Sequence, residues 1–342
     1  TYMNATLFSD ITFPLNIKYN VSFNYNRYNS QQKYSVNTLS GYSFRRGEEA
    51  YSGYALENLN LSMYYTTNYR WIFQNHVTWH RKFEKHDVSV MAGYESSYYN
   101  TNWTKATKTG LIDDSITELD AATEMSAIGG NQEDEASQSI FGRATYAYDD
   151  RYLFEANLRY DASSKFDRKS RWGLFPSFSA GWRISEEAFM ENTGISNLKL
   201  RLSWGKLGNN RIDNYAYQAM YTSGMKYTFG NSLKNGMAQT ELSNGYLRWE
   251  TTTSSNLGVD LGVLDNRLTA QAEVYHKVTD GILYKAPVYA TLGNKTAPYQ
   301  NLCEVTNRGV EVTLSWQDRR GDFSYGVSVN GTYNHNEVTR YK

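Results

Sequence analysis

The stretch Tyr152-Leu153-Phe154-Glu155-Ala156-Asn157-Leu158-Arg159-Tyr160-Asp161-Ala162 alternates between two kinds of side chain. Its even positions are aromatic or aliphatic, and its odd positions from Glu155 onward are Glu, Asn, Arg and Asp. Successive side chains of a β-strand point to opposite faces of a sheet, so this segment has one apolar and one polar face. The pattern predicts a β-strand that is apolar on one face and polar on the other.

The same period-two pattern recurs along most of the chain. It predicts about twelve strands, most of them near the ~9–11 residues that a tilted strand needs to cross a bilayer. Besides the stretch quoted, the clear matches are 17–26, 177–184, 198–204, 257–263, 268–274, 310–316 and 323–329, and the weaker ones are 5–13, 71–79, 88–94 and 138–148.

The connections between these strands alternate in length. Short ones fall at positions such as Asp149-Asp150 and Leu264-Asp265-Asn266. Loops longer than ~12–15 residues are uncommon in compact domains. An up-and-down outer-membrane barrel explains such alternating connections, because it has tight turns at one rim and long extracellular loops at the other. The expected long loops lie near 27–69, 96–137, 208–251 and 280–307.

Composition excludes several classes of protein. The chain has 342 residues with 35 Lys+Arg and 35 Asp+Glu, and this neutral balance does not fit a nucleic-acid binder. The single cysteine, Cys303, excludes an internal disulfide framework. No apolar run exceeds three residues, whereas a membrane-spanning helix needs ~20. The sequence therefore predicts an all-β, antiparallel protein without helical membrane spans.

Two other readings of the alternation stay open at this point. A soluble or surface-anchored β-sandwich that binds glycans also alternates, with its apolar faces meeting in a two-layer core. An enzyme needs a converging catalytic constellation, and none is apparent. His76 and His80 have zinc-like spacing, but on a strand they lie ~13 Å apart, too far for one ion. The acidic run Glu133-Asp134-Glu135 is interpreted as a solvated loop. We expect no catalytic residue, metal or cofactor.

Aromatic residues in the expected loops are the candidate binding residues. Aromatic rings with a polar tip suit both sugar rings and peptide side chains, and they also serve protein contacts. We predict that the residues contacting a substrate include Tyr215, Tyr217, Tyr221, Tyr284, Tyr289 and Trp103.

Several stretches of the chain, in order, resemble one known family. They begin with Ser163-Ser164-Lys165-Phe166 and Arg171-Trp172-Gly173-Leu174-Phe175-Pro176. They continue through Gly205-Lys206-Leu207-Gly208-Asn209 and Leu247-Arg248-Trp249-Glu250, and end with Asn307-Arg308-Gly309-Val310-Glu311. Together these motifs, which cover about residues 138–338, resemble the barrel of SusC/RagA-type TonB-dependent transporters.

The resemblance implies a 22-stranded transmembrane barrel in the bacterial outer membrane, closed by a plug domain. It also implies active import of an oligosaccharide or peptide, driven by TonB through the plug, with a SusD-like lipoprotein as a lid. Polar-face residues such as Arg159, Arg201 and Glu273 are then expected to pack against the plug. Residues 1–342 contain no plug-like segment and about twelve strands. We therefore expect this chain to be an internal part of one barrel domain.

Overall fold

A computed structural model describes residues 1–36, 40–45, 48–53, 59–113, 115–289, 291 and 296–341. Its main feature is one antiparallel sheet of twelve strands in the order β1-β2-β5-β6-β7-β8-β9-β10-β13-β14-β15-β16, so the predicted all-β class is confirmed. The strands are β1 (Tyr2–Phe13), β2 (Ile17–Ser35), β5 (Asn60–Phe83), β6 (His86–Thr109), β7 (Glu124–Tyr148), β8 (Tyr152–Ser163), β9 (Trp172–Arg183), β10 (Ile195–Asn209), β13 (Glu250–Val263), β14 (Leu268–Lys285), β15 (Tyr299–Arg320) and β16 (Phe323–Tyr341).

Smaller elements lie between these strands. Two hairpins form separate two-stranded sheets, β3 (Ser40–Arg45) with β4 (Glu48–Gly53), and β11 (Thr222–Phe229) with β12 (Ser232–Ala238). Short 3-10 helices are η1 (Pro14–Asn16), η3 (Leu119–Ala121), η4 (Ile184–Glu186) and η5 (Ala188–Met190). Within the part of the chain that the structure describes, no helix has the length and apolarity needed to cross a membrane.

The chain divides into two compact units. Unit 1 comprises Thr1–Phe8, Ser22–Phe73 and Ser97–Ala136, and unit 2 comprises Ser9–Val21, Gln74–Ser96 and Ser137–Lys342.

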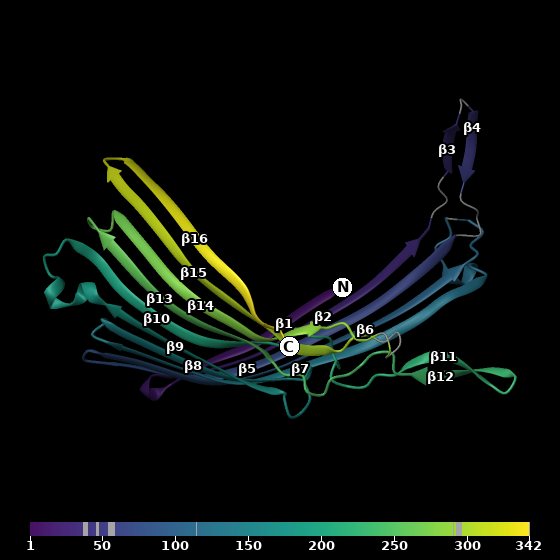
Figure 1. The fold of residues 1–342 in the computed structure, drawn as a ribbon, viewed down its shortest axis with the longest axis horizontal. Coiled ribbons are helices and arrows are strands. Elements are labelled where there is room, and N and C mark those ends of the chain that lie inside the picture. The colour runs from purple at the N-terminus through teal and green to yellow at the C-terminus, as the bar shows by residue number, and fades with distance from the viewer. Residues whose placement is uncertain are drawn as a thin grey trace. The chain divides into compact units, whose positions relative to one another are not determined.

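The register of unit 2 aligns the apolar positions of neighbouring strands. Phe154 of β8 is opposite Ala180 of β9, and Ala180 is opposite Leu202 of β10. The same band continues through Leu257 of β13 and Val274 of β14. Strands β8 to β10 and β13 to β16 run side by side in this unit (Figure 1). Alternation within each strand thus becomes one continuous apolar face across the sheet.

This apolar face is exposed rather than covered by a second layer. Leu158 is 51% exposed, Leu202 55% and Val329 65%. A sandwich core would bury such side chains, as sheets packed face to face interdigitate their inner residues. The β-sandwich alternative is therefore wrong. The apolar face of these strands is open to its surroundings and is not covered by a second protein layer.

The tight turns fall where the sequence predicts them. Asp149 and Asp150 join β7 to β8 with φ of 53° and 52°. Both lie in the left-handed region that two-residue hairpin turns require, and Asp tolerates that region better than most residues. Leu264, Asp265 and Asn266 also have positive φ between β13 and β14.

The expected long loops are shorter than the sequence indicated. β6 and β7 extend into 96–137 and leave 110–123 as the connection, and β14 and β15 reduce 280–307 to 286–298. β2 and β5 likewise extend into 27–69, part of which lies outside the described residues, whereas 208–251 is nearly the connection observed. The alternation fades because both faces of these strand ends carry polar residues. The acidic run at 133–135 therefore lies in β7 and not in a loop.

Candidate functional site

The polar face of unit 2 is cross-linked by arginines. The guanidinium of Arg201 on β10 donates to both carboxylate oxygens of Asp260 on β13, at 2.9 and 3.0 Å. Its third nitrogen donates to Glu273 on β14 at 3.1 Å. A Cβ at Gly258 would lie 2.8 Å from this guanidinium, so glycine leaves room for it. Paired arginine–carboxylate bonds are strong and directional, and here one side chain ties three adjacent strands together.

A hollow of about 500 Å³ lies beside this arginine network in unit 2. Glu155, Lys199, Arg201 and Glu273 contribute charges of both signs to its wall. Ser203 and Asn256 add polar groups, and Leu153, Phe154 and Leu202 also line the hollow. The charged side chains of this wall suit a polar partner or water.

A buried apolar cluster fixes the loops at one end of the unit 2 strands. Phe166 and Leu247 are fully buried and Ile212 is 5% exposed. We call these three residues, with the Trp249, Leu283 and Tyr299 side chains packed against them, the rim cluster. Phe166, Leu247 and Trp249 belong to the motifs that carry the family resemblance, so those motifs build the loop core of this rim.

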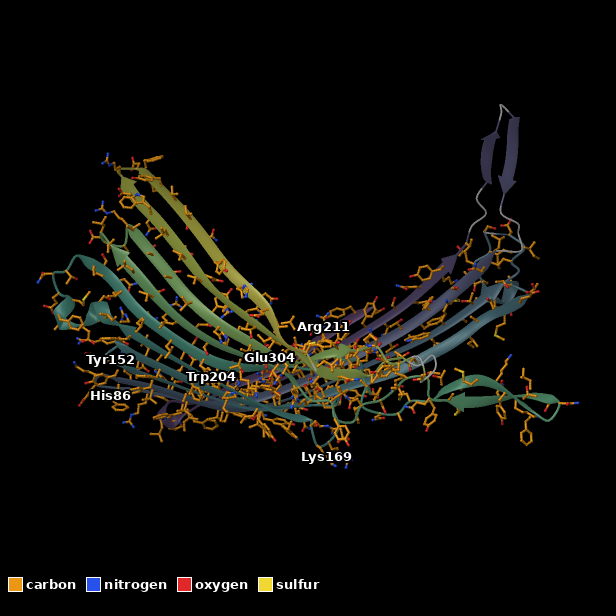
Figure 2. The ribbon with its side chains drawn as sticks, viewed as in Figure 1. His86, Tyr152, Lys169, Trp204, Arg211 and Glu304 are labelled. Carbon is orange, nitrogen blue, oxygen red and sulfur yellow. The ribbon has the colours of Figure 1, made fainter. Side chains whose placement is uncertain are left out.

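Hydrogen bonds complete the packing around the rim cluster. The Trp249 indole donates to the Arg171 carbonyl at 2.9 Å, and the Asn210 amide donates to the Ser163 hydroxyl at 2.9 Å. Glu250 accepts from the Asn209 amide at 3.0 Å and from the Leu283 backbone at 3.1 Å. The β8–β9, β10–β13 and β14–β15 connections are therefore held together as one structure. Figure 2 shows Arg211 at this end of the unit, and His86 and Tyr152 at the opposite end.

Lys285 supplies the charged contacts of this rim. Its ammonium lies 2.8 Å from Asp213 and 3.6 Å from Glu241, and 4.6 Å from the centre of the Tyr299 ring. The hydrogen bond to Asp213 raises the pKa of Lys285 despite its partial burial. Burial first, and then the charge of Asp213, raises the pKa of Tyr299. Both groups keep their neutral-pH charge states over a wide range.

The structure divides the six predicted binding residues into three groups. Tyr217 packs against the rim cluster, and Tyr215 lies half-buried beside it with a φ of 61°. Tyr221, Tyr284 and Tyr289 are 68%, 53% and 84% exposed around the same rim. Trp103 belongs to unit 1, on β6, and is 37% exposed. The three exposed tyrosines have ring surface open to solvent, whereas Tyr217 packs against the rim cluster.

The opposite end of the unit 2 strands has a different construction. Tyr152 stacks on Trp182 with ring centres 6.3 Å apart, and both side chains donate to Glu187, at 2.6 and 3.0 Å. These bonds, with Arg151 nearby, lower the pKa of Glu187. Aromatic residues at strand ends are typical of the interfacial girdles of membrane barrels.

His80 and His86 have local partners. His80 lies 2.8 Å from Asp87 across the β5–β6 turn, and His86 bonds to the Tyr146 hydroxyl at 2.9 Å. His76 and His80 lie on β5, as the strand prediction required. Among the residues that the structure describes, no group of three or more His, Cys, Asp or Glu side chains is placed to hold a metal ion.

Sequence reasoning missed one further group, in unit 1. Tyr34, Tyr64 and Lys105 come from β2, β5 and β6 and line a common hollow. Their positions are 30 and 41 residues apart in the chain, and only strand pairing brings them together. The one signal available in the sequence was the abundance of tyrosine at these strand ends.

The sequence matches the family described as TonB dependent receptor-like, beta-barrel, over residues 2–342. The TonB-dependent receptor P39 of Formosa agariphila is 33% identical over 346 aligned residues, which cover 98% of this chain and 31% of the relative. The TonB-dependent receptor SusC of Bacteroides thetaiotaomicron is 36% identical over 208 residues, covering 59% of this chain and 21% of SusC. The chain thus spans about a third or less of these relatives.

The fold agrees with a solved transporter. The RagAB peptide importer in its closed-closed state has a TM-score of 0.86 at 22% identity, covering 99% of this chain and 36% of that one. The outer membrane transporter YddB from Escherichia coli has a TM-score of 0.62 at 9% identity. At such identities the likeness concerns the fold, and it matches the strand order described above.

Proposed function

The chain belongs to the TonB-dependent receptor β-barrel family, and from this premise we propose that it forms part of the wall of an importer for an oligosaccharide or a peptide. As a barrel segment of this family and of the SusC/RagA type, it is an outer-membrane protein. The two faces of its strands carry the proposal, because exposed aliphatic side chains suit lipid and the charged face suits a polar lumen.

We propose that this chain is part of a longer protein, which contains the other parts of the transporter. The relatives are about three times the length of this chain, and a plug domain that contacts TonB is the element that couples such a barrel to energy. The polar face around Arg201 and Glu273 is the surface that we assign to the plug. A SusD-like lipoprotein is the proposed lid over the loop end, where the rim cluster holds the loops in place.

Cargo contact is assigned to the loop aromatics. Tyr221, Tyr284 and Tyr289 are the exposed members of the predicted set, and Trp103 adds a ring in unit 1. Peptide is the cargo of the RagAB importer, whose fold is similar. Oligosaccharide is the cargo class implied by the resemblance of the sequence motifs to SusC/RagA-type transporters. The relatives are receptors, and we propose no catalytic step for this chain.

The decisive experiment is growth of a strain lacking the full-length gene on a panel of single glycans and peptides. Loss of growth on one nutrient, restored by the intact gene, supports import. Heat-dependent migration of the intact protein and co-purification with a surface lipoprotein test the barrel and the lid. A full-length protein that fractionates as a soluble monomer without detergent contradicts the proposal.

A further inference from the structure

A hollow of about 350 Å³ in unit 1 has the composition of a ligand site. It lies near the connecting-loop ends of β2, β5 and β6. Gln32, Tyr34, Ser62, Tyr64 and Lys105 line it. The wall therefore combines two aromatic rings, an amide, a hydroxyl and one ammonium group.

The two rings are held edge to face. Tyr34 and Tyr64 have ring centres 5.8 Å apart and planes at 87°. The Tyr34 hydroxyl donates to the side-chain oxygen of Gln32 at 2.9 Å. Tyr34 is 55% exposed even so, which leaves ring surface open to a ligand. Aromatic pairs of this geometry are favourable in themselves, so the site is formed before anything binds.

Lys105 lies over one of these rings. Its ammonium lies 4.9 Å from the centre of the Tyr64 ring, within the ~6 Å of a cation–π contact. Ser62 and Thr107, two residues from Lys105 on the same face of β6, are linked through their hydroxyls at 2.8 Å. Strand pairing and this bond therefore hold the backbone beside the lysine in place.

Within the described part of the chain, Lys105 has no ion-pair partner. Among the described residues no carboxylate lies within 4.0 Å of its ammonium, and its partner is a ring face. Lys33 differs in this respect, because its ammonium forms an ion pair with the Glu118 carboxylate at 3.0 Å. The half-buried ammonium and the amide can donate hydrogen bonds to an anion. The two rings offer apolar surface to the chemical group that bears this anion.

We propose that this hollow binds a carboxylate group of the cargo, with Lys105 and the Gln32 amide as donors. The Tyr34 and Tyr64 rings pack against the sugar ring or side chain next to that carboxylate. The inference rests on the proposed function, and it narrows the cargo to an acidic oligomer. A uronate sugar and an acidic peptide share this chemistry, and the test separates them.

The test is equilibrium binding to the purified full-length protein in detergent. The probes are a tetramer of galacturonic acid, a peptide of four glutamates, and maltotetraose as a neutral control. Lys105→Met removes the ammonium and keeps much of the stem. Lys108→Met is the matched control, because Lys108 lies on the same strand and, by strand alternation, on its opposite face.

The expected result is an affinity about tenfold lower for at least one acidic probe in Lys105→Met, the effect of losing a bond to a charged group. Maltotetraose binding and the Lys108→Met variant remain unchanged. Loss for the galacturonate alone identifies a uronate cargo, and loss for the peptide alone an acidic peptide. Lys105→Arg retains most of the affinity, because the positive charge is kept.

Unchanged affinity of Lys105→Met for both acidic probes overturns the inference, as does an equal loss for maltotetraose. Detergent-solubilised variants are first compared for heat-dependent migration, so that a folding defect is recognised separately. Failure of the growth experiment with normal binding contradicts import and leaves the carboxylate site intact. The two proposals are thus tested by different measurements.

Discussion

The two ends of the unit 2 strands are held by different physical means. At the loop end, Phe166 and Leu247 are fully buried in the rim cluster. At the turn end, Tyr152 is 36% exposed, and the nearby contacts are stacked rings and ion pairs around Glu187. One end has a small hydrophobic core, and the other relies on backbone turns and surface contacts.

This difference follows from what the connections bury and not from their length alone. The 164–171 connection at the loop end contains the fully buried Phe166, whereas the longer 184–194 connection at the turn end leaves Phe189 67% exposed. Long loops supply enough apolar side chains to exclude water, and burial stabilises by about 25 cal/mol per Å². The tight β7–β8 turn has nothing to bury, so the left-handed backbone of Asp149 and Asp150 determines its shape. Exposed ion pairs add little, typically ~0–1 kcal/mol. The loop end is therefore the end at which a substitution costs most.

The largest expected effect is that of Phe166→Ala. Removing a fully buried phenylalanine leaves a cavity, and such changes cost about 3–5 kcal/mol. We expect faster protease cleavage in the 164–171 and 210–249 connections of the full-length protein. Phe189→Ala is the control, since Phe189 is 67% exposed at the turn end. Equal protease sensitivity of the two variants would remove the contrast between the ends.

The second effect is that of Asp150→Val at the turn end. Asp150 has a φ of 52°, where a β-branched residue is strained by about 1–2 kcal/mol. Asp150→Gly relieves that strain and serves as the comparison. Thermal unfolding of the full-length protein in detergent should rank glycine above valine. The reverse order would show that the Asp150 side chain, and not its backbone, determines the turn.

A smaller effect is expected at low pH from the turn end. The folded-state pKa of Glu187 lies below its ordinary value of 4.5 because Tyr152 and Trp182 donate to it. The ionised Glu187 therefore stabilises the folded protein above pH 4.5. This stabilisation is lost as the pH falls through the depressed folded-state pKa. Glu187→Gln should flatten this acid-side dependence in a pH series of melting temperatures. An unchanged profile contradicts the assignment.

The smallest effect is expected at high pH from the loop end. The folded-state pKa of Lys285 lies above its ordinary value of 10.5 because of Asp213. Its contribution is complete below pH 10.5 and disappears as the pH rises through the raised pKa. In the parent protein, losing this contribution at alkaline pH should make the loops more sensitive to protease. Lys285→Met should abolish that alkaline increase in sensitivity. An alkaline loss in the variant as large as in the parent protein refutes the role of Lys285.

The strands and tight turns of this protein are predictable because their signals are local. A period of two is visible within eight residues, as in Tyr152 to Arg159, and Asp149-Asp150 marks its own turn. The strand ends near 96–109 and 124–137 were assigned to loops, because residues that are polar on both faces lose that period. The rim cluster was visible only as a set of motifs, without its contacts.

By itself, the sequence determined the all-β class, the two faces of each strand and the family, since these depend on residues close together in the chain. The tertiary structure decided which distant residues meet. Phe166 packs with Leu247 over 81 positions, and Tyr34 meets Tyr64 and Lys105 from three strands. Register and loop closure create such neighbours, and neither is encoded in the period of one strand.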